Sequence, residues 1–514
     1  MHWFDDWALT LAVFVPLVGL AVVLFIPRAH EQAIKTTALV ASLVTAAVGI
    51  GILTDFDYAH GGTLQFNVNK SWIPVIKSRY HMGLDGIALP LLILSMLMVV
   101  LCIIYSWDHF PEPHNPKGFL ALILLLEIGM NGTFVAQDLI LFFVFFELVL
   151  LPMFFMIGVW GGPNRQYAAI KFFLFTLFGS ALMLVSFLAI FFLSKTQTFD
   201  IPKLAQLGGA GIAHGTEVLV FVGLFLGFAI KVPMFPFHTW LPDAHTEAPT
   251  VGSVLLAAIL LKLGAYGFIR IALPILPGAA QTWAPWIGLL AVIGIIYGAL
   301  CCLAQRDMKR LIAFSSVSHM GFVMLGIATL TSFGLNAAIF GMVAHGLITG
   351  MLFFLAGSVQ ERYGTREMSR LGGLLTQVPK LGWILGFCVM ASLGLPGLAG
   401  FWGEFPAILS AYDPAKLAQG LLNGDHLLTF RVFMVIAAIG TVLAAGYLLW
   451  MFQRVAFGTV KAEFEHAHIH DLHIPEWIAW VPLLLLITAL GIYPNLVFHI
   501  TNGAVSNVTK VFGG

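Results

Sequence analysis

Five ionisable residues lie within long apolar stretches, and they constrain this chain more than any other feature. They are Glu127, Glu147, Lys231, Lys262 and Glu404. A charged side chain at the centre of a bilayer costs ~2.5–3.5 kcal/mol on insertion scales, so such residues are rare and usually functional. Three acids and two lysines among apolar spans indicate a series of protonatable sites, which favours the movement of protons or cations.

The composition predicts a polytopic helical membrane protein. Of the 514 residues, 59% are hydrophobic and 10% are charged, whereas soluble domains average about 25% charged residues. The 25 basic and 25 acidic residues balance, so no basic excess favours nucleic acid as a partner. The first residues are acidic and no Ala-x-Ala cleavage site follows, so the first apolar segment is expected to remain as a span.

The cysteines and glycines form no recognisable cofactor motif. The four cysteines lie in apolar segments, and their spacing suits neither a disulfide framework nor a metal or iron–sulfur site: Cys102, Cys301, Cys302 and Cys388. No Gly-rich phosphate loop or dinucleotide-binding fingerprint is present. We therefore expect no nucleotide, metal or redox centre in this chain.

About fourteen apolar segments are long enough to cross a bilayer, which needs ~20 helical residues. Their expected limits are 7–27, 33–54, 84–107, 117–136, 138–160, 166–193, 216–240, 249–273, 282–304, 308–330, 333–357, 380–409, 429–453 and 476–500. An even number of spans places both termini on one side. Lys and Arg are more frequent in the loops after odd-numbered spans, which predicts that both termini lie on the non-cytoplasmic side.

Two spans contain helix-breaking residues at related positions. Span seven contains Lys231-Val-Pro-Met-Phe-Pro236, and span twelve contains Gly394-Leu-Pro-Gly-Leu-Ala-Gly400. Proline removes a helical hydrogen bond, which membrane helices tolerate only where protein or a water-filled cavity satisfies the freed backbone. Interrupted helices at matching positions are typical of inverted-repeat transporters. We therefore expect an all-α fold with two inverted five-helix repeats, spans 4–8 and 9–13, and with spans 7 and 12 discontinuous.

The same pattern predicts four parts of the chain. Residues 1–115 hold helices one to three, and 116–275 hold the first repeat. Residues 276–455 hold the second repeat, and 456–514 hold a loop and helix fourteen.

Each buried charge has a structural alternative beside its functional interpretation. Glu147 could form only a structural hydrogen bond, but a charge-switching role toward a lysine is favoured. Lys231 precedes the first break, where the end of a half-helix favours a cation. Lys262 lies too deep in its span to reach the interface easily. Glu404 could lie near an interface, and Glu127 could simply pair with a neighbouring helix.

The histidines are weaker candidates, because buried imidazoles often serve only packing. His319 and His345 lie in apolar spans, where an imidazole can relay protons. His238 and His245 flank a short loop, with the two interpretations nearly balanced. The run from Glu463 to His473 contains four histidines. We expect a solvated loop or a contact with a partner subunit there, rather than a metal site.

Three long segments resemble the antiporter-like subunits of respiratory complex I. They are Lys231-Val-Pro-Met-Phe-Pro-Phe-His-Thr-Trp-Leu-Pro-Asp-Ala-His-Thr-Glu-Ala-Pro-Thr250, Asp307-Met-Lys-Arg-Leu-Ile-Ala-Phe-Ser-Ser-Val-Ser-His-Met-Gly321 and Gly394-Leu-Pro-Gly-Leu-Ala-Gly-Phe-Trp-Gly-Glu-Phe405. The resemblance covers nearly the whole chain. The Ala-His-Thr-Glu-Ala-Pro-Thr run and the acid at Glu404 resemble subunit M, the equivalent of mitochondrial chain 4, more than subunits L or N.

The resemblance implies roles for the buried residues. Glu147 and Lys231 would form a pair, Lys262 would be the connecting site, and Glu404 would communicate with the far side. His319 and His345 would relay protons between Lys262 and Glu404. Glu127 and His238 are weaker candidates for the same path.

The resemblance also implies the setting. The chain would be a multi-pass protein of the cell inner (plasma) membrane, in contact with lipid and with subunits L and N on either side. Electron transfer from NADH to quinone, through flavin and iron–sulfur clusters in partner subunits, would drive proton translocation here.

Three other functions stay open on the sequence. A subunit of an Mrp-type multisubunit sodium/proton antiporter shares most of these motifs, although the Ala-His-Thr-Glu-Ala-Pro-Thr run argues against it. A transporter of an organic substrate would need a polar pocket, whereas the sequence shows single titratable groups. A purely structural membrane subunit would tolerate neutralisation of the buried charges.

Overall fold

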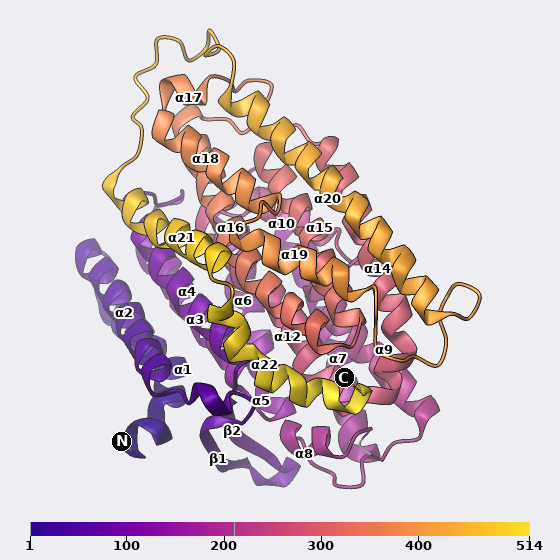
Figure 1. The fold of residues 1–514 in the computed structure, drawn as a ribbon. Helices are drawn as coiled ribbons and strands as arrows, with labels where there is room; N and C mark the ends of the chain where they lie inside the picture. The colour runs from indigo at the N-terminus through magenta and orange to yellow at the C-terminus, as the bar shows by residue number, and fades with distance from the viewer. Residues whose placement is uncertain (1, 210, 514) are drawn as a thin grey trace.

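The fold is a bundle of long helices in the computed structural model, which describes residues 2–209 and 211–513 (Figure 1). Within those residues, thirteen helices are long and apolar enough to cross a membrane. Two shorter helices in series, Pro379–Ser392 and Ala399–Ser410, lie in the segment where one further span is expected. The marked ends of the chain lie toward the same end of the bundle (Figure 1).

The N-terminal part contains three membrane helices and a β-hairpin. The helices are α1 (His2–Phe25), α2 (Glu31–Asp55) and α3 (Ala88–Tyr105). Between α2 and α3 lie η1 (Tyr58–His60), β1 (Gln65–Ile73), η2 (Pro74–Ile76) and β2 (Ser78–Leu84). The strands are antiparallel, with Val68 opposite Met82 and Asn69 opposite His81. The sequence analysis did not anticipate this hairpin, which lies at the end of the bundle that holds the N-terminus (Figure 1).

The next group of helices covers spans four to eight. Its elements are α4 (Pro116–Val135), α5 (Leu139–Leu148), α6 (Leu150–Trp160), α7 (Arg165–Leu193), α8 (Ile201–Gln206), α9 (His214–Lys231), α10 (Trp240–Glu247), α11 (Thr250–Leu255), η3 (Leu256–Leu260), α12 (Leu261–Gly267), η4 (Phe268–Ala272) and α13 (Leu273–Ile275). Helix α9 ends at Lys231 and α10 begins at Trp240. Span seven is therefore interrupted around Pro233 and Pro236.

The remaining helices cover spans nine to fourteen. They are α14 (Pro277–Leu303), α15 (Met308–Ala328), α16 (Ser332–Tyr363), α17 (Leu374–Gln377), α18 (Pro379–Ser392), α19 (Ala399–Ser410), α20 (His426–Ala456), α21 (Ile474–Ile492), α22 (Asn495–Thr509) and η5 (Lys510–Phe512). Span twelve is interrupted between α18 and α19. In that break Gly394 has φ 80° and Gly397 has φ 95°, a left-handed backbone that glycine adopts without steric cost.

Burial separates central helices from peripheral ones. The most apolar windows of the span Thr250–Ile275 and of α16 are 100% buried, whereas those of α2 and α20 are 33% buried. Helix α20 exposes Val435, Ile439 and Val442, three or four residues apart, which gives one apolar face on the outside of the bundle. Such a face suits lipid or an apolar partner, and it leaves span eight and α16 in the protein interior, away from lipid.

Candidate functional site

Lys262 lies in a span that departs from regular α-helix on both sides of it. Its helix α12 is flanked by the π-helical segments η3 and η4. Such wide turns are rare and often mark functional sites. The Lys262 ammonium is fully buried and donates to the carbonyl of Ala257, five residues earlier. Lys262 Nζ also lies 2.7 Å from His345 Nδ1.

A line of side chains continues from His345 to Glu404. The rings of His345 and His319 have centroids 6.1 Å apart. His319 Nδ1 lies 2.5 Å from Glu404 Oε1, and its Nε2 lies 3.1 Å from the hydroxyl of Tyr447. The structure therefore brings Lys262, His345, His319 and Glu404 together, although they come from four separate helices.

A small cavity of about 20 Å³ adjoins this line and is lined by His319, His345, Thr349, Ser392 and Glu404. That volume is enough for one water molecule, which needs ~10–15 Å³ and polar partners. The second carboxylate oxygen of Glu404 and Nε2 of His345 are buried and have no hydrogen-bond partner among the residues that the structure describes. A water molecule in this cavity would therefore form hydrogen bonds with that Glu404 oxygen and with His345 Nε2.

Local capping explains where the helices of this line begin. Asp307 accepts a hydrogen bond from the Arg310 amide and starts α15, which carries His319. The Thr331 hydroxyl accepts from the Gly334 amide and starts α16, which carries His345. Both residues satisfy amide groups that a helix start leaves unpaired.

Glu147 and Lys231 are neighbours but do not form a direct ion pair. Lys231 is buried at the last position of α9, and its Nζ lies 4.8 Å from the centroid of the Phe146 ring. Glu147 is half-buried on α5, and its charge is close enough to act on Lys231. On the opposite side, a Cβ added to Gly264 would lie 3.0 Å from the Lys231 Cβ. The glycine therefore lets Lys231 approach the helix of Lys262.

Glu127 and His238 are not part of the line. Both carboxylate oxygens of Glu127 are buried on α4 and, within residues 2–209 and 211–513, have no hydrogen-bond partner. His238 lies in the break of span seven, where its ring packs against Phe235 and Tyr297 with centroids 5.8 and 5.0 Å away. Among the described residues, neither forms a hydrogen bond or an ion pair with the four residues joined above.

Two cationic residues that the sequence analysis did not single out, Lys309 and Arg270, are buried. Lys309 is 2% exposed, and its Nζ donates to the carbonyl of Ala248. Arg270 pairs with Asp85 at 2.5 Å and donates to the hydroxyl of Tyr266 at 3.0 Å. Both residues lie near the ends of apolar segments, where a charged residue is usually exposed in a loop. Their burial depends on helices that are distant in the sequence, so the sequence did not predict it.

Two larger cavities lie at opposite ends of the central helices. One of about 650 Å³ is lined by Glu247, Thr250, Lys309 and Glu361, which lie at or near the ends of α10, α11, α15 and α16. The other, of about 370 Å³, borders Asp85 and Arg270. Span eight runs from the first cavity at Thr250, through Lys262, to the second at Arg270. His245, buried and stacked on Phe353, lies near the first cavity and leaves both ring nitrogens without partners.

The fold and this buried line define a membrane subunit of the ion-translocating, antiporter-like class. Residues 136–422 match the family described as NADH:quinone oxidoreductase/Mrp antiporter, transmembrane. Residues 11–133 match the amino terminus of NADH-ubiquinone oxidoreductase chain 4. The chain belongs to the NADH:quinone oxidoreductase/Mrp antiporter transmembrane family.

Individual relatives separate the two branches of this family. NADH-quinone oxidoreductase subunit M of Rickettsia prowazekii is 39% identical over 507 residues, covering 98% of this chain and 99% of the relative. A chain of respiratory complex I from Thermus thermophilus is 30% identical, with a TM-score of 0.86 over 98% of this chain and 100% of that one. A chain of the Mrp complex from Dietzia is 20% identical with a TM-score of 0.85 over 99% of both chains, which shows the shared fold alone. The resemblance to subunit M is thus confirmed, and the Mrp alternative has only a distant match.

Proposed function

We propose that this chain is the M-type membrane subunit of an NADH–quinone oxidoreductase and translocates protons. The line of Lys262, His345, His319 and Glu404 carries the proposal. Two contacts in it are short enough for direct proton transfer, 2.7 and 2.5 Å, because transfer needs a hydrogen bond or one bridging water. The remaining step, between the two imidazoles, borders the 20 Å³ cavity.

The pair of Glu147 and Lys231 would control this line by charge. At the low dielectric of a membrane interior, moving an opposite charge by a few ångströms changes how tightly a lysine holds its proton. Gly264 lets Lys231 lie close to the helix that carries Lys262. A change in the charge of Lys231 would therefore change the electrostatic environment of Lys262. Protons would be taken up from the cavity near Lys309 and would leave toward the opposite side of the membrane.

Several finer expectations belong to the same proposal. The redox centres, flavin and iron–sulfur clusters, would reside in partner subunits, with subunits L and N beside this chain. The membrane would be the cell inner (plasma) membrane, with both termini on the non-cytoplasmic side. The four-part division at residues 115, 275 and 455, and the inverted relation of the two repeats, also stay predictions. Glu127 and His238 stay weaker candidates, because neither touches the line.

Substitution of Lys262 tests the function directly. In the intact complex reconstituted in vesicles, Lys262→Met should abolish proton pumping while the subunits still assemble. Lys262→Arg retains the charge, but an arginine does not release its proton in proteins, so pumping should fail there too. A structural role for the charge predicts instead that arginine restores pumping. Lys416→Met, at an exposed position, is the matched control and should pump normally.

A further inference from the structure

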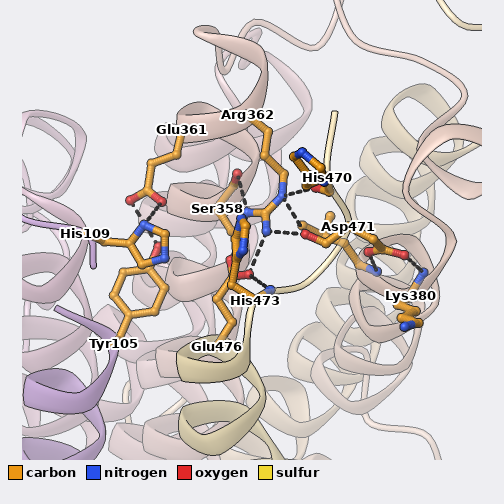
Figure 2. A network of polar contacts seen from close by, with 11 residues as sticks. Tyr105, His109, Ser358, Glu361, Arg362, Lys380, His470, Asp471, His473 and Glu476 are labelled. Carbon is orange, nitrogen blue, oxygen red and sulfur yellow. Dashed lines mark hydrogen bonds and ion pairs between the residues drawn. The ribbon is translucent and has the colours of Figure 1, made fainter. Parts of the chain in front are cut away.

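The loop between α20 and α21, residues 457–473, is fixed across the ends of three helices; we call it the histidine strap. Arg362 of α16 donates to the backbone carbonyls of His470 at 2.9 Å and Asp471 at 2.5 Å. The Asp471 carboxylate accepts from the amides of Lys380 and Leu381 at the start of α18, at 2.9 and 3.1 Å. Figure 2 shows these contacts on one side of the Arg362 guanidinium. The strap therefore holds its histidines in a defined place.

Arg362 also joins the strap to the start of α21. Its guanidinium donates to both carboxylate oxygens of Glu476, at 2.6 and 2.8 Å, and the Ser358 hydroxyl donates to the same carboxylate. The Glu476 side chain is fully buried and that of Arg362 is 7% exposed. The additional hydrogen bonds satisfy the polar groups of the buried ion pair between Arg362 and Glu476. The pair therefore anchors the strap, and the histidine rings take no part in it.

Three imidazoles stand in a row from the strap to the loop after α3. The ring centroids of His470 and His473 are 6.2 Å apart, and those of His473 and His109 are 6.3 Å apart. His109 Nδ1 lies 2.8 Å from Glu361 Oε2 of α16, and its ring stacks on Tyr105 of α3 at 4.9 Å. Figure 2 shows His109 beside the Glu361 carboxylate.

The charges around His109 favour its protonated form. Burial alone would lower the pKa of His109, but the hydrogen bond and charge of Glu361 raise it above 6.5. Glu476 acts in the same direction, and Arg362 opposes it. His109 therefore keeps its proton to a higher pH than an unperturbed imidazole would, while the side chains of His470 and His473 are exposed to the solvent.

This row opens onto the larger cavity. His109, His473 and Glu361 line its outer part, and Thr250, Gly357 and Lys309 line it where span eight, α16 and α15 begin or end. Those three helices carry Lys262, His345 and His319. The imidazoles thus stand where solution meets the interior that leads to the proposed proton line.

We propose that His470, His473 and His109 form a proton-collecting cluster at the mouth of this cavity, which supplies the translocation path. The inference rests on the proposed function. An imidazole nitrogen takes up a proton from water or buffer, and the proton passes to the next ring or to water in the cavity. Only N–H and O–H bonds form and break, and no oxidant or reductant is needed.

The rate at which protons diffuse to a single acceptor would limit turnover, and a cluster of acceptors raises that rate. A diffusion-limited encounter proceeds at ~10⁹–10¹⁰ M⁻¹s⁻¹, so at about pH 8, with ~10⁻⁸ M free protons, one site captures only ~10–100 protons per second. Enzymes typically turn over ~1–10³ times per second, so a single acceptor would limit the rate. Several imidazoles close together present a larger target for protons, because each ring can take up a proton on a nitrogen.

The test measures how the rate depends on mobile buffer. The intact complex is placed in vesicles with the strap facing the outer medium, and NADH-driven quinone reduction and pumping are followed at about pH 8. In weakly buffered medium, His470→Gln/His473→Gln should slow both by about threefold relative to the parent, since capture by a smaller target is limiting. Concentrated imidazole buffer should restore the parent rate, because the buffer delivers protons directly.

The matched control is His466→Gln/His468→Gln, which removes two exposed histidines from the same strap but outside the row. It should behave as the parent at every buffer concentration. Three results would overturn the proposal: no loss in weak buffer, a loss that buffer does not restore, or the same loss in the control. Pumping by the Lys262→Met complex would instead refute the proposed function, so the two failures are distinguishable.

Discussion

His319 Nδ1 lies 2.5 Å from Glu404 Oε1, although the two residues are 85 positions apart in the chain. The contact joins α15 to the second half of the interrupted span twelve. The hydroxyls of Tyr447 and Ser392 lie 3.1 and 3.3 Å from the other ring nitrogen, so the imidazole has polar partners on both sides. Such a ring can take up a proton on one nitrogen and release a proton from the other nitrogen while the side chain stays in place.

Glu404→Gln tests the acid at the end of this line. Glutamine keeps the size and the hydrogen-bonding capacity of the side chain but cannot exchange a proton. Proton pumping and coupled quinone reduction should fall by roughly tenfold or more, because a positioned acid or base contributes ~10²–10⁴-fold. Pumping is measured with a pH-sensitive dye in vesicles. The control is Asp413→Asn, at an exposed position; near-normal pumping by Glu404→Gln would remove Glu404 from the path.

Glu147→Gln separates control by charge from structural support. If the Glu147 charge controls how tightly Lys231 holds its proton, the complex should assemble while pumping and NADH–quinone activity both fall severely. Both fall because electron transfer is coupled to pumping and stops when one proton-transfer step is blocked. Electron transfer to artificial acceptors upstream of quinone should be retained. If Glu147 only supports the fold, an assembled Glu147→Gln complex will pump normally. Glu465→Gln, at an exposed position of the strap, controls for the loss of an acid.

Gly264→Ala tests the contact between the two lysine-bearing helices. The new Cβ would lie 2.7 Å from the Phe228 carbonyl oxygen and 2.8 Å from Val232 Cγ2, so α12 must move away from α9. Overpacking of this kind costs ~1–3 kcal/mol, and pumping should weaken because Lys231 is displaced. Thermal unfolding of the complex measures the first effect.

Gly446→Ala is the control for that substitution, because nothing lies within 4 Å of a Cβ at this position of α20. It should be neutral or stabilising by up to ~1 kcal/mol, since alanine lowers the entropy of the unfolded chain. Equal thermal midpoints for the Gly264→Ala and Gly446→Ala complexes would show that the close approach has no energetic importance.

The ion pair of His109 and Glu361 predicts a pH-dependent contribution to stability. The pKa of His109 in the folded protein is raised above 6.5 by Glu361 despite burial. The stabilisation is therefore fully present below about pH 6.5 and is lost as the pH rises through the higher pKa of the folded state. The thermal midpoint of His109→Gln should fall furthest below that of the parent at acidic pH. The two should converge in alkaline solution, and His499→Gln should show no such trend; a constant difference would contradict the assignment.

Much of the architecture follows from sequence patterns. Apolar stretches of membrane-spanning length predicted the number of crossings, because a bilayer accepts only helices that satisfy their own backbone. Pro233 and Gly394 predicted where two of them break, since proline removes a helical hydrogen bond and glycine permits a left-handed backbone. The π-helical turns around Lys262 carry no such signal, because their residues are ordinary helix formers. The hairpin of β1 and β2 was missed for a related reason, since its short polar strands have no membrane-spanning length.

The sequence by itself therefore determined which ionisable groups lie deep within apolar stretches, because a charge with apolar residues on both sides stands out against them. Only the tertiary structure decided which of these groups meet. Lys262, His345, His319 and Glu404 converge because four helices pack together. Glu127 has the same sequence signal, but its carboxylate has no hydrogen-bond partner in the described part of the chain. Lys309 shows the converse, since its place beside a loop hid its burial. Contact between distant segments depends on packing and helix rotation, which local residue patterns do not encode.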